Sequence, residues 1–351
     1  MTNSFWQGKR VLITGHTGFK GSWLSEVLLG LGSEVHGLAL APETSPSLFC
    51  QLGLANRIEN NLGDIRDLSV VQQVVKSASP EIVFHLAAQP LVRRSYRQPL
   101  DTWATNVMGT AHVLEAVRFL EAPCAIVVVT TDKVYENREW EHPYRETDRL
   151  GGHDPYSASK AGAELVAASW RSAFLSGSPI RLATARAGNV IGGGDWSEDR
   201  LIPDFARAFG AGKTLTIRNR TSIRPWQHVL DPLNGYLLLA EALAGRGGKR
   251  FETGFNFGPE PSDQRSVGDL IEAASGHWHG DWQDATDPNA PHESGKLSLS
   301  IERARQLLGW TPRWNFDASV RATIDWYREV AQGSDAKAIV RRQIHDFGFP
   351  A

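Results

Sequence analysis

The chain has little cysteine and no long hydrophobic run. Its 351 residues include only two cysteines, Cys50 and Cys124, whose spacing fits neither a metal-binding set nor a redox pair. We therefore expect buried thiols in a reducing compartment, and no metal site. No stretch reaches the roughly 18 apolar residues that a membrane span needs, and residues 1–8 lack a basic-then-apolar leader. These absences predict a cytoplasmic protein.

Charge of either sign is not in excess. The chain has 37 Lys and Arg residues against 39 Asp and Glu residues, a formal net charge of -2. Such a balance gives no electrostatic reason to expect a nucleic-acid partner. Any basic site must therefore be local.

Short apolar runs alternate with longer segments of helical period in the first half of the chain. We interpret as buried strands the runs 10–14, 35–40, 82–87, 125–131 and 181–185, and we expect helices over 103–120 and 157–174. This alternation predicts an α/β fold, a doubly wound parallel sheet of the Rossmann kind. The length exceeds that of one simple domain, so a smaller second lobe is expected.

The chain after residue 187 is expected to form most of that lobe, which interleaves with the sheet domain. A helix at 232–244 and a strand at 255–258 should return to the sheet. We therefore assign 1–186 and about 228–260 to the Rossmann domain, and 187–227 and 261–351 to the substrate-binding lobe. Segment 276–295 is interpreted as a surface excursion over the cleft, with a solvated loop of no special role as the alternative.

A glycine-rich turn follows the first expected strand. Gly15, Gly18 and Gly21 stand three residues apart, with Thr17 and Phe19 between them, and apolar residues at helical spacing follow. Glycine at these positions lets the backbone turn tightly and approach a diphosphate at a helix N-terminus. In this strand-turn-helix context the pattern predicts dinucleotide binding rather than an ordinary turn. The GxxGxxG spacing resembles that of the short-chain dehydrogenase/reductase superfamily.

The end of the second expected strand lacks the acidic residue that would bind the ribose hydroxyls of NAD. Glu43 comes late, and no Arg or Lys stands nearby to take the extra phosphate of NADP. The residues alone therefore favour NAD only weakly. Asp64 and Ile65 would follow a third strand, between the runs 35–40 and 82–87. They resemble the superfamily's adenine-contacting pair, and an Asp that merely caps a helix is the alternative.

Tyr156 and Lys160 share one face of an expected helix. They lie four residues apart, and Asp154 followed by Pro155 marks the helix N-terminus. A nearby ammonium and the positive helix end both favour phenolate, so we expect the pKa of Tyr156 to lie well below its usual value of about 10. Such a tyrosine is suited to accept an alcohol proton.

Thr131, Asp132 and Lys133 follow a central strand at the edge where open sheets bind ligands. In the superfamily a Ser or Thr at this place acts with the Tyr-Lys pair, and Asn106 resembles the fourth active-site residue, although a lone Asn can be purely structural. An added acid and base suggest chemistry beyond one hydride transfer. A solvated Asp-Lys pair in a surface loop is the alternative.

Four motifs together resemble the nucleotide-sugar 4,6-dehydratases of the extended short-chain dehydrogenase/reductase superfamily. They are the segments 15–21, 131–133, 156–160 and 224–229, and the likeness spans nearly the whole chain. Thr-Asp-Lys combined with His-Thr-Gly-Phe-Lys-Gly is similar to the branch that acts on CDP-glucose. The resemblance implies NAD as the cofactor and a nucleotide sugar as the substrate.

The resemblance also implies which residues meet the ligands. Those expected at the cofactor, besides the glycine turn and the pair at 64–65, are Leu86, Ala87, Ala88, Gln89, Tyr156 and Lys160. Those expected at the substrate are Gln89, Arg186, Asn189, Arg218, Arg224 and His292. Arginine suits a diphosphate because guanidinium binds phosphate in bidentate fashion. The family further implies a homodimer, or a tetramer, packed through the helices of Asn106 and Tyr156.

The implied mechanism has three stages. Tyr156, aided by Thr131 and Lys160, removes the proton of the sugar 4-hydroxyl while carbon 4 loses hydride to NAD. Lys133 then removes the proton of carbon 5 while Asp132 protonates the departing 6-hydroxyl, and the hydride returns to carbon 6. A Lys133 that acts as a base must be partly neutral near pH 7, which requires a depressed pKa.

Three other functions share parts of this pattern. A nucleotide-sugar C4 epimerase would need Thr131, Tyr156 and Lys160 but neither Asp132 nor Lys133. A dehydratase for a dTDP-, GDP- or UDP-linked sugar would share the chemistry and differ in the base pocket. A non-catalytic NAD-sensing or scaffold protein would have no reason to keep the full Thr, Tyr and Lys set.

Overall fold

The apolar runs of the sequence form one seven-stranded parallel sheet. The structure is a computed structural model that describes residues 3–217, 219–285 and 297–349. The strand order is β11-β6-β5-β4-β1-β2-β3. The strands are β1 (Arg10–Thr14), β2 (Glu34–Ala39), β3 (Glu59–Leu62), β4 (Ile82–His85), β5 (Cys124–Val129), β6 (Ile180–Ala187) and β11 (Gly254–Phe257). The expected doubly wound parallel fold is confirmed.

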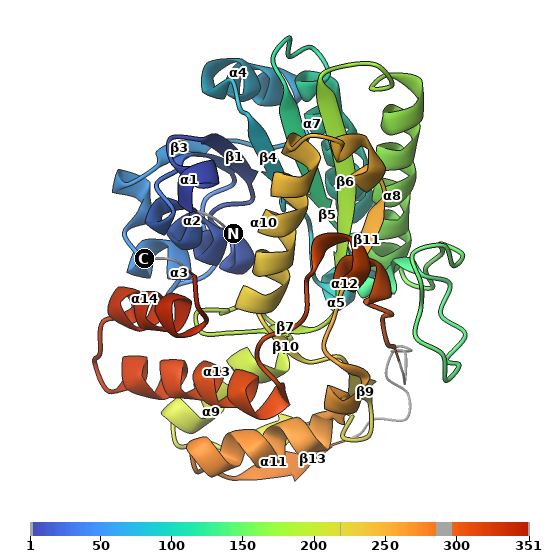
Figure 1. Cartoon of the computed structure of the whole chain (residues 1–351). Helices are drawn as coiled ribbons and strands as arrows, with labels where there is room; N and C mark the ends of the chain where they lie inside the picture. Colours follow the sequence, from blue (N-terminus) through green and yellow to red (C-terminus); the bar gives the residue numbers. More distant parts are fainter. Residues whose placement is uncertain (1–2, 218, 286–296, 350–351) are drawn as a thin grey trace.

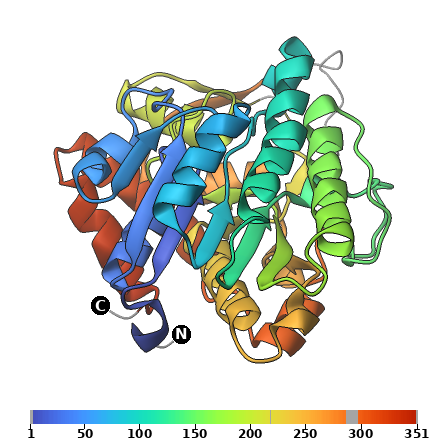
Figure 2. The ribbon, with the colours of Figure 1, turned by 90° about the horizontal axis from the view of Figure 1, so that it is seen from above.

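Helices cover both faces of this sheet (Figure 1, and from above in Figure 2). One face carries α2 (Phe19–Gly30) and α10 (Leu230–Ala244), and the other carries α4 (Leu68–Ala78), α7 (Gly109–Val117) and α8 (Pro155–Ala173). Successive residues of β1 show why its sequence is apolar throughout. Val11 and Ile13 pack in the core of the first face, whereas Leu12 packs in the core of the second. Strand side chains alternate between faces, so a strand covered on both sides has no polar face.

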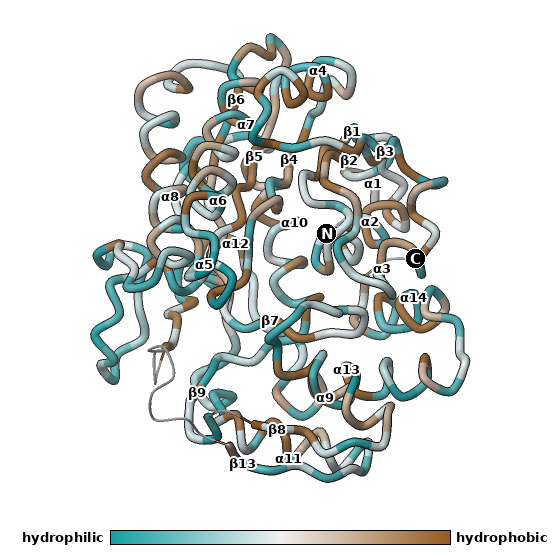
Figure 3. The backbone as a smooth tube through the Cα atoms, turned by 180° about the vertical axis from the view of Figure 1, so that it is seen from behind, coloured by the Kyte–Doolittle hydropathy of each residue, from teal (hydrophilic) through white to brown (hydrophobic). Residues whose placement is uncertain are grey.

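The distribution of hydropathy follows this layering. In Figure 3 the hydrophobic colour gathers in the strands of the sheet and on the inner sides of the helices, while the long loop before α8 is largely hydrophilic. Among the helices that the structure describes, none is long and apolar enough to cross a membrane. Cys124 is buried in β5, but Cys50 is exposed near the end of α3 (Leu48–Gln51), so the expectation of two buried thiols is wrong for Cys50.

The smaller lobe lies beyond the carboxyl ends of the strands, at the bottom of Figure 1. Its helices are α9 (Leu201–Gly210), α11 (Val267–His277) and α13 (Phe316–Ala331). Its strands pair as β7 (Val190–Ile191) with β10 (Gln227–His228), β9 (Ile223–Arg224) with β12 (Arg265–Ser266), and β8 (Leu215–Ile217) with β13 (Trp282–Asp284). The start of the expected 276–295 excursion is therefore tied into the lobe through β13.

Two helices from the segment assigned to the lobe also contact the sheet domain. α12 (Glu302–Leu308) contacts β11 and α10, and α14 (Ala336–Asp346) contacts α2 and α3 (Leu48–Gln51). Arg341 of α14 binds the buried Glu26 of α2 at 2.7 Å. The end of the chain thus packs on the helix that begins at the glycine turn.

The single helix expected over 103–120 is divided in the structure. It consists of α6 (Pro99–Trp103), a π-helical segment η2 (Ala104–Met108) and α7. The Thr110 hydroxyl donates to the Asn106 carbonyl at 2.7 Å, which satisfies a backbone acceptor in the widened turn. Such π-helical segments are frequent at functional sites. Two further short helices are α1 (Asn3–Trp6) and α5 (Val92–Arg97).

A buried ion pair joins α8 to the middle of the sheet. The Arg186 guanidinium on β6 donates to the Glu164 carboxylate on α8 at 2.8 and 2.9 Å. The hydroxyls of Thr130 and Thr184 donate to the same carboxylate at 2.6 and 2.7 Å. Burial raises the pKa of Glu164, but the Arg186 charge and these hydrogen bonds outweigh burial and lower the pKa below its ordinary value. Every polar atom of the pair has a hydrogen-bond partner. The pair therefore fixes the position of α8 relative to the sheet and to the site.

Replacing Arg186 by Met should lower the free energy of unfolding by about 3–5 kcal/mol, because Glu164 would stay buried without a counter-charge. Arg342→Met is the matched control: it removes the same charge from an exposed pair with Glu329 at 2.7 Å and should cost at most about 1 kcal/mol. Urea unfolding followed by tryptophan fluorescence measures both. Equally small losses would contradict the role assigned to the buried pair.

Candidate active site

One large pocket lies where the carboxyl ends of the strands meet the lobe. Its volume is about 1080 Å³, which exceeds that of a site for a single drug-sized ligand. The expected residues that line it are Gly15, Thr17, Gly18, Phe19, Gly21, Asp64, Ile65, Leu86, Ala87, Ala88, Thr131, Asp132, Lys133, Tyr156, Lys160, Asn189 and Arg224. The pocket therefore gathers most of the residues that the sequence singled out, from both parts of the fold.

The glycine turn leaves open space at the N-terminus of α2. Gly15 has φ +80°, a conformation that favours glycine, and a side chain there would meet the Ala87 nitrogen at 2.7 Å. A Cβ on Gly21 would collide with the Gly15 carbonyl oxygen. Gly18 is the N-cap of α2, so the first free N–H groups of that helix face the pocket. The residues present thus fit the diphosphate of a dinucleotide.

A cation that the sequence did not single out lies at the rim of the pocket, beside β2 and β3. Arg66 lines the pocket, and its guanidinium donates to Asp64 at 2.6 and 2.8 Å and to Asp101 at 3.2 Å. These hydrogen bonds, more than the Arg66 charge itself, hold the pKa of Asp64 below its ordinary value. Since Arg66 is already paired with two carboxylates, its guanidinium is not free to bind the extra phosphate of NADP.

Thr131, Tyr156 and Lys160 meet at the centre of the pocket. Asp154 caps α8 by accepting from the Ser157 N–H, with Pro155 at the first helical position, as the sequence predicts. One turn further along α8, the Lys160 ammonium donates to the Val129 carbonyl at the end of β5, at 3.1 Å. Burial lowers the pKa of Lys160 to about 8. The Tyr156 hydroxyl lies close enough to Thr131 for that side chain to lower its pKa, so one helix and one strand end bring the three groups together.

The prediction that the pKa of Tyr156 lies below its usual value is wrong. Burial raises the pKa of Tyr156 to about 12, and the nearby Asp132 adds to this rise. The Thr131 hydrogen bond and the Arg200 charge lower the pKa, but they do not offset burial. Desolvation of the phenolate therefore outweighs the helix end that the sequence suggested.

Asp132 is buried beside these groups. Its Oδ1 accepts from the Thr131 hydroxyl at 2.9 Å, whereas its Oδ2 has no hydrogen-bond partner among the described residues. Burial raises the pKa of Asp132, against the lowering effect of Lys133 and Arg224. A buried carboxyl with a raised pKa and one unpaired oxygen at a pocket wall is suited to carry a proton.

Lys133 stands next in the chain and is half-buried at the pocket wall. Its backbone N–H donates to the Thr131 hydroxyl at 3.3 Å, within the short helical turn formed by residues 132–134. A basic side chain therefore lies beside an acidic one on the same turn.

Three expected ligand-contacting residues do not line the pocket. The Gln89 amide donates to the Leu91 carbonyl and to Thr102, at 3.1 and 2.9 Å, and so holds its own loop. Asn106 is buried: it accepts from the Gln89 N–H at 2.8 Å and donates to Ser159 at 2.9 Å. Asn106 thus ties that loop to α8 and acts as a positioning residue. The Gln89 and Asn106 side chains are both used within the protein.

Arg186 is the third of these residues outside the pocket lining. Its guanidinium is saturated by Glu164 and also donates to the Tyr135 hydroxyl at 2.8 Å, so it is not presented to a substrate. The sequence could not show this, because the partner lies on another element. Of the other substrate-side residues, Asn189 and Arg224 line the pocket, while Arg218 and His292 lie outside the described residues.

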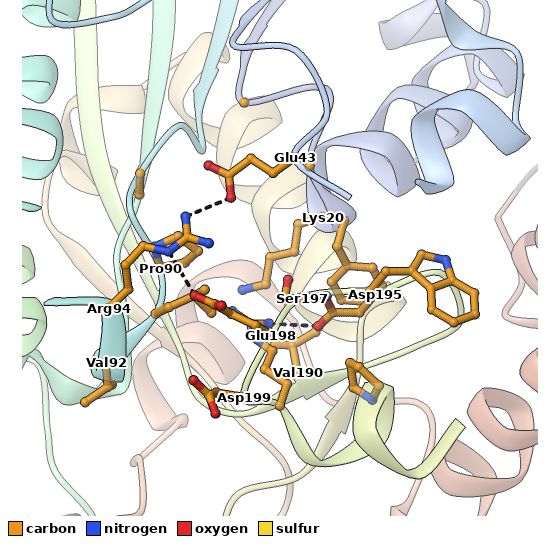
Figure 4. A pocket seen from close by; sticks show the side chains of 18 of the residues that line it. Lys20, Glu43, Pro90, Val92, Arg94, Val190, Asp195, Ser197, Glu198 and Asp199 are labelled. Carbon is orange, nitrogen blue, oxygen red and sulfur yellow. Dashed lines mark hydrogen bonds and ion pairs between the residues drawn. The ribbon is translucent and has the colours of Figure 1, made fainter. Parts of the chain in front are cut away.

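Charged residues that the sequence analysis passed over close one side of the pocket (Figure 4). Arg94 of α5 binds Glu43, which follows β2, at 2.8 Å and Glu198 of the lobe at 3.1 Å. Lys20 and Asp195 point toward the same cavity. The only sequence signal was indirect: Lys20 stands inside the glycine motif, and Arg94 inside the loop after β4.

Comparison with known proteins agrees with this geometry. A family model described as GDP-mannose 4,6 dehydratase matches residues 12–323. A CDP-glucose 4,6-dehydratase from Salmonella typhimurium strain LT2 is 47% identical over 350 residues, which are 98% of this chain and 97% of that protein. A dTDP-glucose 4,6-dehydratase from Streptomyces antibioticus is 31% identical over 271 residues, 76% of this chain and 75% of that one.

Solved structures give the same result at the level of the fold. A dTDP-glucose 4,6-dehydratase from Streptomyces venezuelae, with NAD bound, superposes with a TM-score of 0.76 at 26% identity, covering 91% of this chain and 98% of that one. A UDP-glucose-4-epimerase from Stenotrophomonas maltophila reaches 0.78 at 22% identity, covering 93% and 100%, and is a likeness of fold alone. Because the family model and the Salmonella protein match most of its length, this chain belongs to the GDP-mannose 4,6-dehydratase family.

Proposed function

We propose that this chain is an NAD-dependent CDP-glucose 4,6-dehydratase, which converts CDP-glucose to CDP-4-keto-6-deoxyglucose and water. The observation that carries the proposal is the buried Asp132, with one unpaired carboxyl oxygen, beside Thr131, Tyr156 and Lys160 in one pocket. The 47% identity to a CDP-glucose 4,6-dehydratase supports the choice of substrate. The pocket volume leaves room for a dinucleotide and a sugar nucleotide together.

Tyr156 is proposed to take the proton of the sugar 4-hydroxyl. When bound, NAD supplies the acceptor for the hydride of carbon 4 and the donor that returns it at carbon 6. Since burial raises the Tyr156 pKa to about 12, formation of the phenolate requires a positive charge beside the phenol. The Lys160 ammonium, held on the Val129 carbonyl, contributes part of that positive field.

Asp132 and Lys133 are proposed to carry out the elimination. Burial raises the pKa of Asp132 and so favours its protonated form, which is the form that can protonate the departing 6-hydroxyl. Lys133 is proposed to remove the proton of carbon 5, which the ketone at carbon 4 acidifies, and to return a proton to carbon 5 when hydride is added at carbon 6. An epimerase would need neither group, and the cost of burying Asp132 with an unpaired oxygen favours the dehydratase over that alternative.

Asn189 and Arg224 are proposed to bind the diphosphate of the sugar nucleotide. Arg224 is buried at the pocket wall and lies near Asp132, so a phosphate bound to it would place the sugar beside the acid. A buried guanidinium binds an anion more strongly than an exposed one, because water competes less.

The substrate assignment predicts a specific product and a specific label transfer. Incubated with CDP-, dTDP-, UDP- and GDP-glucose in turn, the enzyme should turn over CDP-glucose fastest and release the 4-keto-6-deoxy sugar without accumulating NADH. Deuterium at carbon 4 should reappear at carbon 6, as mass spectrometry and NMR can show. Steady NADH formation would instead indicate a simple dehydrogenase, and inversion at carbon 4 an epimerase.

The elimination step can be isolated by mutation. Asp132→Asn or Lys133→Met should leave the first oxidation intact and lower deoxysugar formation by at least about 10²-fold, because general acid or base help is worth about 10²–10⁴. Each variant should therefore trap enzyme-bound NADH in a single turnover, which absorbance detects. Tyr156→Phe is the control, since it should form neither NADH nor product while binding NAD within a few-fold of wild type. Normal product rates in both variants would refute the assignment.

We further infer that the enzyme is a cytoplasmic homodimer. The support for dimerisation is a group of exposed apolar side chains on packed neighbours: Trp103 ends α6, Met108 ends η2 and Leu165 lies on α8, with Leu165 61% exposed. Adjacent apolar side chains of this size rarely face water without a partner. The helices that carry Asn106 and Tyr156 would then form the interface.

Leu165→Glu should shift the protein toward the monomer in sedimentation velocity at micromolar concentration, because a carboxylate would be buried without a partner. Leu307→Glu is the matched control, because Leu307 is also exposed but lies on α12. It should leave the distribution between monomer and dimer unchanged. A wild-type protein that sediments as a monomer would rule out the dimer, and an unchanged Leu165→Glu dimer would rule out this surface.

A further inference from the structure

Lys20 brings an unpaired ammonium to the pocket. It is the second residue of α2 and lies between Gly18 and Gly21 of the glycine turn, here called the glycine cradle. Its side chain points into the cavity in Figure 4. Throughout the described ranges 3–217, 219–285 and 297–349, no hydrogen bond or ion pair engages it. A half-buried cation without a counter-ion needs an explanation.

The surroundings of Lys20 are poor in available negative charge. Burial, together with the charges of Arg200 and Lys160, lowers the pKa of Lys20 to about 7, and Asp132 and Asp195 only partly oppose this. Asp195 is bound to Arg200 at 3.0 Å. Three cations thus share a region whose two nearby carboxylates are a buried acid and a partner of Arg200. Such a region is complementary to an anion that comes from outside the chain.

The position of Lys20 on α2 indicates which anion. The N-terminus of α2 is where the glycine cradle fits a dinucleotide diphosphate, and the backbone N–H groups there carry the positive end of the helix dipole. A cation on the first turn of the same helix adds to that field. Arg224, by contrast, comes from the lobe, on the side proposed for the sugar nucleotide.

The end of β2 gives a reason why such a contact would be useful. No carboxylate follows β2 directly, and Glu43 is engaged by Arg94 at 2.8 Å. The usual acidic ligand of the adenosine ribose is therefore missing, and the cofactor must be held more strongly elsewhere. We propose that the Lys20 ammonium binds the diphosphate of the dinucleotide as a charged side-chain ligand beside the glycine cradle. This inference rests on the proposed use of NAD.

Binding of ADP-ribose, NAD and CDP by calorimetry tests the proposal, because ADP-ribose carries the diphosphate without the nicotinamide. Lys20→Met should weaken ADP-ribose and NAD alike by about ten- to a hundredfold, the range for a charged hydrogen bond, and leave CDP unchanged. Lys20→Arg should restore both to within a few-fold. Lys213→Met removes an equal charge from an exposed site away from the pocket and should change nothing. Thermal melts confirm that the variants are folded.

The pH dependence supplies a second readout. A diphosphate favours the charged ammonium, so it raises the Lys20 pKa from about 7, and affinity is greatest below pH 7 and declines as pH rises above it. Lys160, with a pKa of about 8, titrates nearby, and Asp132, Asp195 and Arg200 also face Lys20. Comparison with Lys20→Arg, whose charge is constant, isolates the Lys20 contribution: its ADP-ribose affinity should decline less with pH than that of wild type.

Three results would overturn the proposal. Equal ADP-ribose affinities in wild type and Lys20→Met would show that the side chain binds no diphosphate of the cofactor. A loss for CDP but not for ADP-ribose would assign Lys20 to the sugar nucleotide instead. A loss for NAD alone would point to the nicotinamide. A wild-type protein that binds neither NAD nor ADP-ribose would refute the cofactor proposal itself, which is a distinguishable outcome.

Discussion

The buried ion pair between Glu164 and Arg186 is the constraint on which the arrangement of the site depends. Glu164 lies on α8 one helical turn beyond Lys160, and it receives hydrogen bonds from Thr130, at the end of β5, as well as from β6. The residue after Thr130 is Thr131. The same carboxylate therefore fixes the distance between the helix that carries Tyr156 and the strand end that meets it.

A second connection holds the opposite side of α8. Asn106, in the π-helical segment, bonds both to Ser159 of α8 and to the backbone of the loop after β4. The Tyr156 N–H in turn donates to the Ser95 hydroxyl of α5 at 3.1 Å. Residues outside the pocket thus position those that line it, and catalytic geometry tolerates little displacement.

The charges of the pocket form a consistent pattern. Burial disfavours every ionised form, so it raises the pKa values of Asp132 and Tyr156 and lowers those of Lys20 and Lys160. The pKa values of Lys20 and Lys160 consequently lie closer to neutral pH than those of exposed lysines. Proton transfer at neutral pH is easiest for such groups. Tyr156 is the exception whose pKa must be changed by what binds beside it.

The sequence by itself determined the features that depend on neighbours along the chain. The apolar runs established the parallel sheet, Asp154 and Pro155 marked the start of α8, and the glycine spacing identified the cradle at α2. Strand β3 lacks the apolar pattern because its residues, Glu-Asn-Asn-Leu, lie at an exposed edge of the sheet. Periodicity reports burial, and an edge strand has little of it.

Only the tertiary structure decided which side chains are buried and with what. Arg186 was expected among the substrate-binding residues, but its guanidinium is bound to Glu164, on another element. The Tyr156 pKa depended on desolvation, which no spacing along the chain measures. The role proposed for Lys20 depends on the cations that surround it in space. Burial and charge pairing arise between segments distant in sequence, so a local pattern can name the reactive residue types but cannot assign their partners or their protonation.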